Sequence, residues 1–338
     1  MRAHLILLSA FLLAATAQPQ QAPSADPAAA SGAPARSLEQ PTPRPKSKTV
    51  PIDAPALSYY AVPTGVLDHE VHTIPASDAD RLARLKTAFT QVDCTGDRMR
   101  IQDMKDGQNL ICTWPGKDPS TIVVVAHYPH KGKGEGAVDD WSGAALLPYL
   151  YLAVQAAPRT NTYVFLECTG EKGNEEYLKS LSKQQKKDIR AVVDLMGLGV
   201  SPVPRFYTPS DTADPKADAF HLQLEFLYST FSDSRLQLPQ PLNPQRWITT
   251  DDTEAFRFSQ TPAIIIHSIP QTSVGLPGSA QDTAAAVDTA NYYWNYRTIA
   301  IYLAALDGVA EKLATNDPLW GAGGSGYRLN LNDLPWVH

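Results

Sequence analysis

Short apolar runs alternate along this chain with longer segments in which apolar residues recur at helical spacing. Runs of β-branched and other apolar residues are typical of buried strands, and apolar residues spaced three and four apart are typical of helices. Strands are expected at 98–104, 108–114, 121–126, 162–168, 191–196 and 262–267. Helices are expected at 77–90, 141–155, 182–190, 220–229 and 289–314. This alternation predicts the α/β class, with a mostly parallel sheet covered on both faces.

Three local signals fix details of these elements. Ser77 followed by Asp80 forms a capping box that opens the first helix. Asp106-Gly107 lies between two strand patterns and predicts a tight hairpin. Pro148 lies inside the helix expected at 141–155, and we expect it to kink or break that helix, because proline cannot donate the backbone hydrogen bond.

The ends of the chain differ in composition from its centre. Residues 1–17 combine a positive start, a short apolar core and a small-x-small end, which predicts a signal peptide; a retained membrane anchor is the alternative. Residues 18–56 are rich in Pro, Ala, Ser and Gln and are expected to form a disordered linker. A folded domain is expected at 57–314 and a C-terminal tail at 315–338. The expected location is therefore secreted or periplasmic.

Composition narrows the classes of partner. The chain has 338 residues, 43% of them hydrophobic, and a net charge of −6, which supports a real core. No basic stripe is present, so we expect no nucleic-acid partner. No segment after the signal peptide is apolar enough to be expected to span a membrane. The sequence leaves the oligomeric state open.

Export permits disulfide bonds, and the chain has three cysteines. Cys94 and Cys112 flank the expected hairpin, and we expect them to pair. Cys168 would then be a buried odd thiol. The alternative is that all three thiols stay reduced.

Metal-binding side chains follow three of the expected strands. His127 ends the strand at 121–126, and a glycine-bearing loop then presents Asp139 just before a helix. Glu171 follows the next strand, and Asp194 lies in the third. Ligands gather at the carboxyl ends of strands in open α/β sheets. One imidazole and two carboxylates suit zinc with a position left for water, and Glu171 could act as general base.

Other hydrolytic chemistries have little support in the sequence. No Gly-x-Ser-x-Gly elbow and no phosphate-binding loop occurs. Cys168 has no histidine near it in sequence, which argues against a cysteine nucleophile.

Several motifs resemble the zinc exopeptidase family that includes bacterial leucine aminopeptidase, glutaminyl cyclase and the transferrin-receptor ectodomain. The matching segments are 109–116, 126–127, 136–143, 162–171, 194–197, 262–267 and 282–283. The segment 136–143, Gly-Ala-Val-Asp-Asp-Trp-Ser-Gly, is the most specific of them. The resemblance implies a three-layer αβα sandwich around a mixed, mostly parallel sheet.

The resemblance also implies a metal centre. The family binds two zinc ions that share one aspartate. His127, Asp139 and Asp194 would hold the first ion, with Asp139 as the shared ligand and Glu171 as the general base. Asp140 would form an unusual peptide bond that shapes this site.

Three positions depart from the family pattern. Lys172 stands where the second ion needs a glutamate, and Gly278 stands where it needs a histidine. Pro129 replaces an aspartate that orients the first histidine, a change of a kind that can cost roughly ten- to a hundred-fold in metal affinity or activity. One zinc ion rather than two is therefore expected. In an alternative alignment, Glu171 becomes the second-ion ligand and Gly170 replaces the base.

The charge of Lys172 could stand in for the missing second ion, or this side chain could hold a substrate carboxylate or a developing oxyanion. The alternative is an exposed loop charge. His130 could be a substitute ligand, although a loop histidine is the plainer interpretation. His267 ends a strand and is expected to be a core histidine.

The expected function is that of an exported, zinc-dependent, aminopeptidase-like enzyme that hydrolyses peptide or amide bonds through a metal-bound water. The catalytic residues would be Glu171 and Lys172, and the partner a peptide substrate. The alternative is a catalytically inactive pseudo-peptidase that uses the same cleft as a binding module. Transferase chemistry like that of glutaminyl cyclase is a weaker analogy, because this chain lacks the final histidine of that site.

Overall fold

A computed structural model describes residues 58–207, 253–258 and 261–314, all of which belong to one compact unit, Pro45–His338. The signal peptide, the linker, the helix expected at 220–229 and the C-terminal tail lie outside the described residues. Those four expectations stay predictions.

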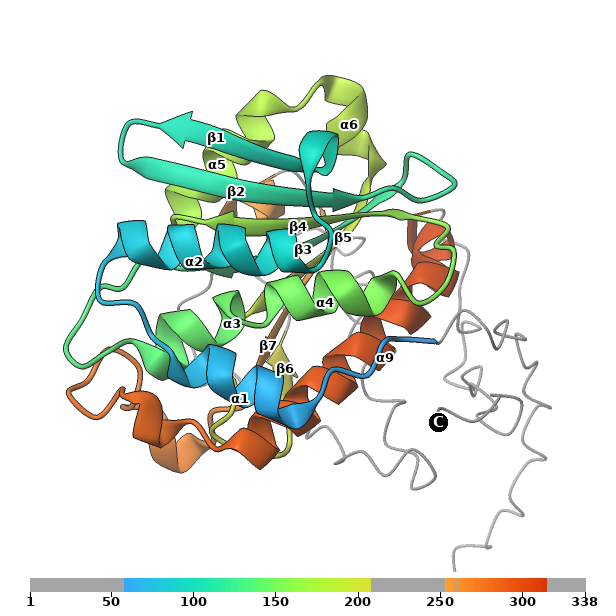
Figure 1. Cartoon of the computed structure of the whole chain (residues 1–338). Helices are drawn as coiled ribbons and strands as arrows, with labels where there is room; N and C mark the ends of the chain where they lie inside the picture. The colour runs from blue at the N-terminus through green and yellow to red at the C-terminus, as the bar shows by residue number, and fades with distance from the viewer. Residues whose placement is uncertain (1–57, 208–252, 259–260, 315–338) are drawn as a thin grey trace, which may run out of the picture. The chain divides into compact units, whose positions relative to one another are not determined.

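The described residues build a seven-stranded sheet in the order β1-β2-β4-β3-β5-β7-β6 (Figure 1). The central strands β4, β3, β5 and β7 are mutually parallel, whereas β2 and β6 pair antiparallel with their inner neighbours. The sheet is therefore mixed, as the sequence predicted. The strands are β1 (Met99–Met104), β2 (Gly107–Trp114), β3 (Thr121–His127), β4 (Thr162–Cys168), β5 (Ile189–Leu195), β6 (Arg205–Tyr207) and β7 (Ala263–His267).

Helices cover both faces of this sheet, which gives the predicted three-layer arrangement. On one face lie α1 (Thr64–His72), α2 (Asp78–Gln91), α3 (Ser142–Ala144), α4 (Leu147–Val154) and α9 (Thr289–Ala314) (Figure 1). On the other lie α5 (Glu171–Ser180), α6 (Lys183–Asp188) and α8 (Glu254–Phe258).

The two faces of β3 show why its sequence is apolar throughout. Ile122 and Val124 point into the core beneath α4 and α9, whereas Val123 and Val125 point into the core beneath α5 and α8. Successive side chains of a strand alternate between the faces of a sheet, so a strand covered on both sides must be apolar at every position.

Several local predictions are confirmed. Ser77 caps α2, and its hydroxyl oxygen accepts from the backbone N–H of Asp80 at 3.1 Å. The helix expected at 141–155 is broken, because α3 ends at Ala144 and α4 begins at Leu147, with Pro148 in the first turn of α4. The break comes just before the proline, since the first turn of a helix is where a missing N–H costs nothing.

The disulfide prediction is also confirmed. Cys94 and Cys112 are bonded, and they join the loop after α2 to β2. Cys168 is buried, as expected. The cross-link therefore holds a helix of one layer against the sheet.

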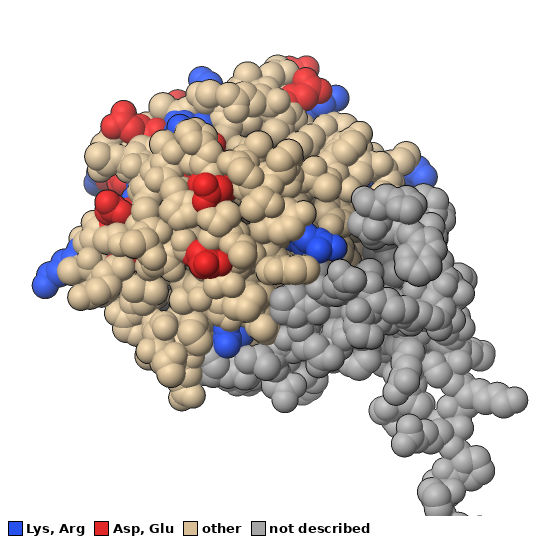
Figure 2. Space-filling view, turned by 60° about the horizontal axis from the view of Figure 1, so that its bottom comes forward, with Lys and Arg blue, Asp and Glu red and all other residues tan. Residues whose placement is uncertain are grey.

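Two surface properties follow from the described residues. None of their helices combines the length and the apolar character needed to cross a bilayer. On the face shown in Figure 2, lysine and arginine side chains lie scattered among acidic and uncharged ones. This face thus has no basic stripe of the kind that binds nucleic acid.

Candidate metal centre

A cavity of about 710 Å³ opens at the carboxyl ends of β3 and β4. His127, Asp139, Glu171 and Lys172 all line it. Its other lining residues are Asp78, Asp106, Gly107, Tyr128, Pro129, Lys131, Asp140, Thr169, Gly170 and Met196. Four of the five residues expected to carry the chemistry therefore share one cavity.

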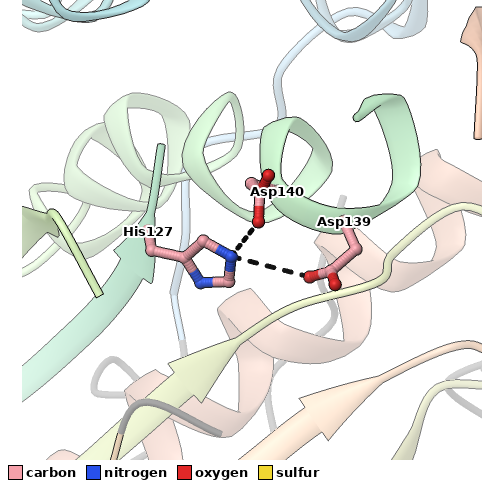
Figure 3. Close-up of side chains that lie close together, drawn as sticks. All are labelled: His127, Asp139 and Asp140. Atoms are coloured by element: carbon pink, nitrogen blue, oxygen red, sulfur yellow. Dashed lines mark hydrogen bonds and ion pairs between the residues drawn. The ribbon is translucent and has the colours of Figure 1, made fainter. Parts of the chain in front are cut away.

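Two consecutive aspartates converge on His127 within this cavity. The Nε2 atom of His127 lies 3.7 Å from Oδ1 of Asp139 and in direct contact with Oδ1 of Asp140 (Figure 3). One ligand atom from each of these three residues lies within 4.8 Å of the others. The arrangement is compact enough for a single ion.

The backbone of Asp139 explains how neighbouring residues can face one imidazole. Side chains of consecutive residues in a regular helix point about 100° apart. Asp139 departs from helical torsion angles, with φ −127° and ψ 95°, inside the turn Ala137–Trp141. No peptide bond among the described residues is cis. The irregularity expected in the peptide bond of Asp140 therefore lies instead in the torsion angles of Asp139.

Asp282 holds the loop that carries these aspartates. Its carboxylate accepts from the backbone N–H groups of Val138 at 2.7 Å, Asp139 at 3.3 Å and Gly278 at 3.1 Å. Burial raises the pKa of Asp282, although these three hydrogen bonds act in the opposite direction. Sequence reasoning found Asp282 only as the end of a motif and missed this supporting role.

Arg81 of α2 supports the same loop from another side. Its guanidinium donates to the carbonyl oxygens of Tyr128 at 3.0 Å and Glu135 at 2.6 Å, which lie before and after the glycine-rich segment. Nothing in the sequence distinguished this arginine from the exposed charges of its helix.

His130 lies beside the cluster. Its Nδ1 is 3.1 Å from Oδ2 of Asp140, and its backbone N–H donates to Oδ1 of Asp78 at 3.1 Å. Asp140 is therefore placed between two imidazoles. His130 lies in a loop, as the plainer interpretation expected, and it also contacts the carboxylate of Asp140.

Lys172 lies differently from the arrangement expected, whereas Asp194 lies in β5, the strand that was expected to carry it. The side chain of Lys172 is 81% exposed, and its Nζ lies 3.9 Å from Oδ2 of Asp106. Solvent screens a charge at that exposure, so the structure gives little support to Lys172 as a substitute for a second ion. Asp194 is buried in β5, and it is not part of the ligand-spaced group found among the described residues.

Glu167 is a buried carboxyl group near the site that sequence reasoning did not mark. It lies in β4 and has no exposed surface. Burial raises the pKa of Glu167 well above its ordinary range, and His127 lowers it by a smaller amount. Among the described residues, neither carboxylate oxygen of Glu167 has a hydrogen-bond partner.

His267 has the core position expected of it. It is fully buried at the end of β7, and its Nδ1 accepts from the backbone N–H of Ile269 at 3.2 Å.

The chemistry of the donor set fits a divalent metal ion. Imidazole nitrogen and carboxylate oxygen bind zinc at about 2.0–2.2 Å, which puts tetrahedral donors a little over 3 Å apart. The separation of 3.7 Å between His127 and Asp139 is close to that requirement. The carboxylates of Asp139 and Asp140 also carry two negative charges, which balance the two positive charges of such an ion.

Part of this chain matches known proteins in sequence. The probable leucine aminopeptidase of Arthroderma otae is 35% identical over 97 residues, which cover 25% of this chain and 26% of that protein. The chain thus spans about a quarter of the length of the curated relatives it matches.

Solved structures show the same architecture at low sequence identity. The Legionella pneumophila LapA aminopeptidase has a TM-score of 0.56 at 17% identity, with 72% of this chain and 70% of that chain covered. The glutaminyl cyclase of an Acidobacteriales bacterium has a TM-score of 0.56 at 17% identity, with 79% and 99% covered. Both share the fold of this chain.

The family assignment comes from the sequence match that spans most of the sheet. The pattern of peptidase family M28 matches residues 109–300, more than half of the 338 residues. That segment contains His127, Asp139 and Glu171. The chain is a member of peptidase family M28.

Proposed function

We propose that this chain is a zinc-dependent, aminopeptidase-like enzyme that hydrolyses peptide or amide bonds. The observation that carries the proposal is the approach of His127 and Asp139 to each other in a cavity that Glu171 also lines. Membership of a peptidase family supports peptides as the substrate class.

His127 and Asp139 would hold the ion, and a further carboxylate would complete the set, for which the family pattern offers Asp194. Zinc at such a site supplies Lewis acidity that polarises a carbonyl group and activates water. The carboxylate of Glu171, at the start of α5, would take the proton from the attacking water and pass it to the leaving amine.

Lys172 would act from the rim of the cavity. Its exposed ammonium group lies near Asp106 on the hairpin and could turn to bind a carboxylate or a carbonyl oxygen of the substrate. Its exposure supports a role in substrate contact rather than in holding the site together.

We propose one zinc ion rather than two. Gly278 occupies the position where the resemblance requires a histidine, and its φ of +67° is in the left-handed region that favours glycine. A histidine there would be strained, and Lys172 removes the other ligand that a second ion needs.

Export of the protein is also a proposal. The sequence of residues 1–17 supports a signal peptide, and the disulfide between Cys94 and Cys112 supports an oxidising compartment, secreted or periplasmic.

Hydrolysis of leucine 4-nitroanilide by the purified protein tests the proposed function. We expect hydrolysis that a chelator abolishes and zinc restores. Glu171→Gln should lower kcat by about 10²- to 10⁴-fold with its zinc content unchanged. Glu175→Gln, an exposed change on the same helix, is the matched control and should leave the rate unaltered.

The same experiment also has an outcome that contradicts the proposed function. If the wild-type protein hydrolyses the substrate no faster than the His127→Ala variant, the proposal of a peptidase is wrong. Tight zinc binding without any hydrolysis would then favour the inactive pseudo-peptidase, in which the cavity binds a peptide and leaves it intact.

A further inference from the structure

We propose that Asn109, a buried residue of β2, positions Glu171, the candidate general base. Asn109 would do so by holding the first turn of α5, the helix that begins at Glu171. This inference rests on the proposed function, because it takes Glu171 as the group that removes the proton from the attacking water. It adds to that reaction a residue of the β1–β2 hairpin, which forms one edge of the sheet (Figure 1).

The first support is a hydrogen bond from Asn109 to the turn that carries Glu171. The side-chain amide of Asn109 donates from Nδ2 to the carbonyl oxygen of Gly173 at 2.8 Å. Gly173 follows Glu171 by two residues, so both lie in the first turn of α5. Asn109 is fully buried, and a hydrogen bond is stronger in such surroundings than in water.

The second support is the way in which α5 begins. The residue before Glu171 is Gly170, which has a φ of +84° and offers no side chain to cap the helix. A helix without a capping side chain depends more on contacts with other segments for the placement of its first turn. The amide of Asn109 provides such a contact.

The third support is the close packing of Gly173 against Asn109. An added Cβ at Gly173 would lie 2.7 Å from Oδ1 of Asn109 and 2.9 Å from Oγ1 of Thr169. Both distances are too short for a real Cβ atom, so only glycine lets the helix approach this closely. Glycine is also a poor helix former, which makes its presence in the first turn a cost to the helix alone. The approach of α5 to Asn109 is therefore specified by both residues.

The neighbour of Asn109 in β2 contacts the other side of the site. The hydroxyl group of Tyr128, the residue after His127, donates to the carbonyl oxygen of Gln108 at 2.8 Å. Two consecutive residues of β2 thus hold the segment that follows a metal ligand and the helix that begins with the base. The hairpin therefore helps to set the spacing between His127 and Glu171.

Asn109 itself is not placed to touch the substrate. It is not among the residues that line the cavity, whereas Glu171 is. A general base must lie within hydrogen-bond reach of the proton that it removes, and a misplacement of about 1 Å can lower a rate about 100-fold. Loss of the Asn109 contact should therefore lower kcat without weakening the binding of substrate or zinc.

Steady-state hydrolysis of leucine 4-nitroanilide by the zinc-loaded full chain tests the inference. Asn109→Ala should lower kcat about 10- to 100-fold, with KM and zinc content unchanged. Asn161→Ala is the matched control. Asn161 is also fully buried, and its Nδ2 donates to the carbonyl oxygen of Asp307 at 2.9 Å, just before β4 and at the end of that strand remote from the cavity. This control should lower stability and leave kcat unaltered.

A double variant separates a positioning role from a general structural one. If Asn109 acts through Glu171, Asn109→Ala should cause no further loss in the residual rate of Glu171→Gln. If Asn109 only supports the fold, the two losses in rate should multiply. Multiplied losses would overturn the inference.

Gly173→Ala disturbs the same contact from the side of the helix, and it provides the test if Asn109→Ala does not fold. Alanine favours the helix more than glycine does, but its Cβ would push the first turn of α5 away from Asn109. We expect kcat to fall while far-ultraviolet circular dichroism shows a folded, helical protein. Wild-type kcat in folded Gly173→Ala would contradict the requirement for this close approach.

The outcomes separate this inference from the proposed function. Wild-type kcat in Asn109→Ala would overturn the inference and leave a zinc peptidase intact. Loss of zinc from Asn109→Ala would also overturn it, because the effect would then pass through the metal ligands rather than through Glu171. A wild-type protein that binds zinc and hydrolyses no substrate would overturn the proposed function, and the inference with it.

Discussion

The backbone N–H of Asp139 donates to the carboxylate of Asp282, a residue 143 positions later in the chain. The same carboxylate accepts from Val138 and Gly278, so it joins the loop before α9 to the loop after β3. The candidate metal centre therefore depends on a contact between segments that are far apart in the chain.

Asp282→Ala should destabilise the metal-free protein by about 3 kcal/mol or more, because three N–H groups lose a charged acceptor. Urea-induced unfolding measures this free energy. Asp288→Asn is the control, since Asp288 is exposed and caps the first turn of α9, where asparagine serves as well. A loss below about 1 kcal/mol in Asp282→Ala would show that the contact does not hold the loop.

Glu167→Gln should change the pH dependence of stability in the metal-free protein. Burial raises the pKa of Glu167, so the folded state binds its proton more tightly than the unfolded state. This contribution to stability is fully present below the unfolded-state pKa, about 4.3, and is lost as pH rises through the folded-state pKa. Above about pH 4.3, the free energy of unfolding of Glu167→Gln should therefore rise relative to that of the wild type. The difference should grow by up to about 1.4 kcal/mol per pH unit.

Urea unfolding of wild type and Glu167→Gln between pH 4 and pH 8 measures this difference. Glu175→Gln removes an exposed carboxylate of α5 and should follow the wild-type curve. If Glu167→Gln also runs parallel to the wild type over the whole range, its carboxyl group is not perturbed by burial.

Lys172→Ala should lower kcat/KM for peptide substrates and leave zinc affinity unchanged. The ammonium of Lys172 is exposed and pairs with Asp106, and exposed pairs contribute only about 0.2–1 kcal/mol to stability. Steady-state kinetics and chelator competition measure the two quantities separately. Lys179→Ala removes another exposed lysine of α5 and should alter neither. A fall in zinc affinity in Lys172→Ala would restore the idea that its charge replaces a second ion.

Removal of the disulfide should cost about 3 kcal/mol of stability, since Cys94 and Cys112 close a loop with a sequence separation of 18. The double variant Cys94→Ala/Cys112→Ala and the wild type in reductant should unfold at similar urea concentrations. The double variant should show no further response to reductant. Unfolding of the wild type that is insensitive to reductant would contradict this account.

The sequence predicted the elements with long apolar runs best. The bounds of β4 and α9 agree with those expected from apolar periodicity. The sequence pattern did not predict α5, because this helix contains Gly173 and Asn174, both poor helix formers. Packing explains this helix: Asn109 donates to the carbonyl of Gly173 at 2.8 Å, and an added Cβ at Gly173 would lie 2.7 Å from the side chain of Asn109.

The candidate site was predictable only in part. His127 and Asp139 follow from the rule that ligands gather at the carboxyl ends of strands. The approach of Asp140 to the same imidazole depends on the torsion angles of Asp139, which no local sequence pattern specifies. The contact of Asp282 with that loop joins segments far apart in the chain, so it required the folded structure.

The zinc content of the purified protein after exhaustive dialysis, measured by inductively coupled plasma mass spectrometry, tests the central claim most directly. The account predicts one zinc per chain in the wild type and close to none in His127→Ala, with the variant still folded. Absence of zinc from the wild type, or an equal amount in both proteins, would contradict a metal centre at His127.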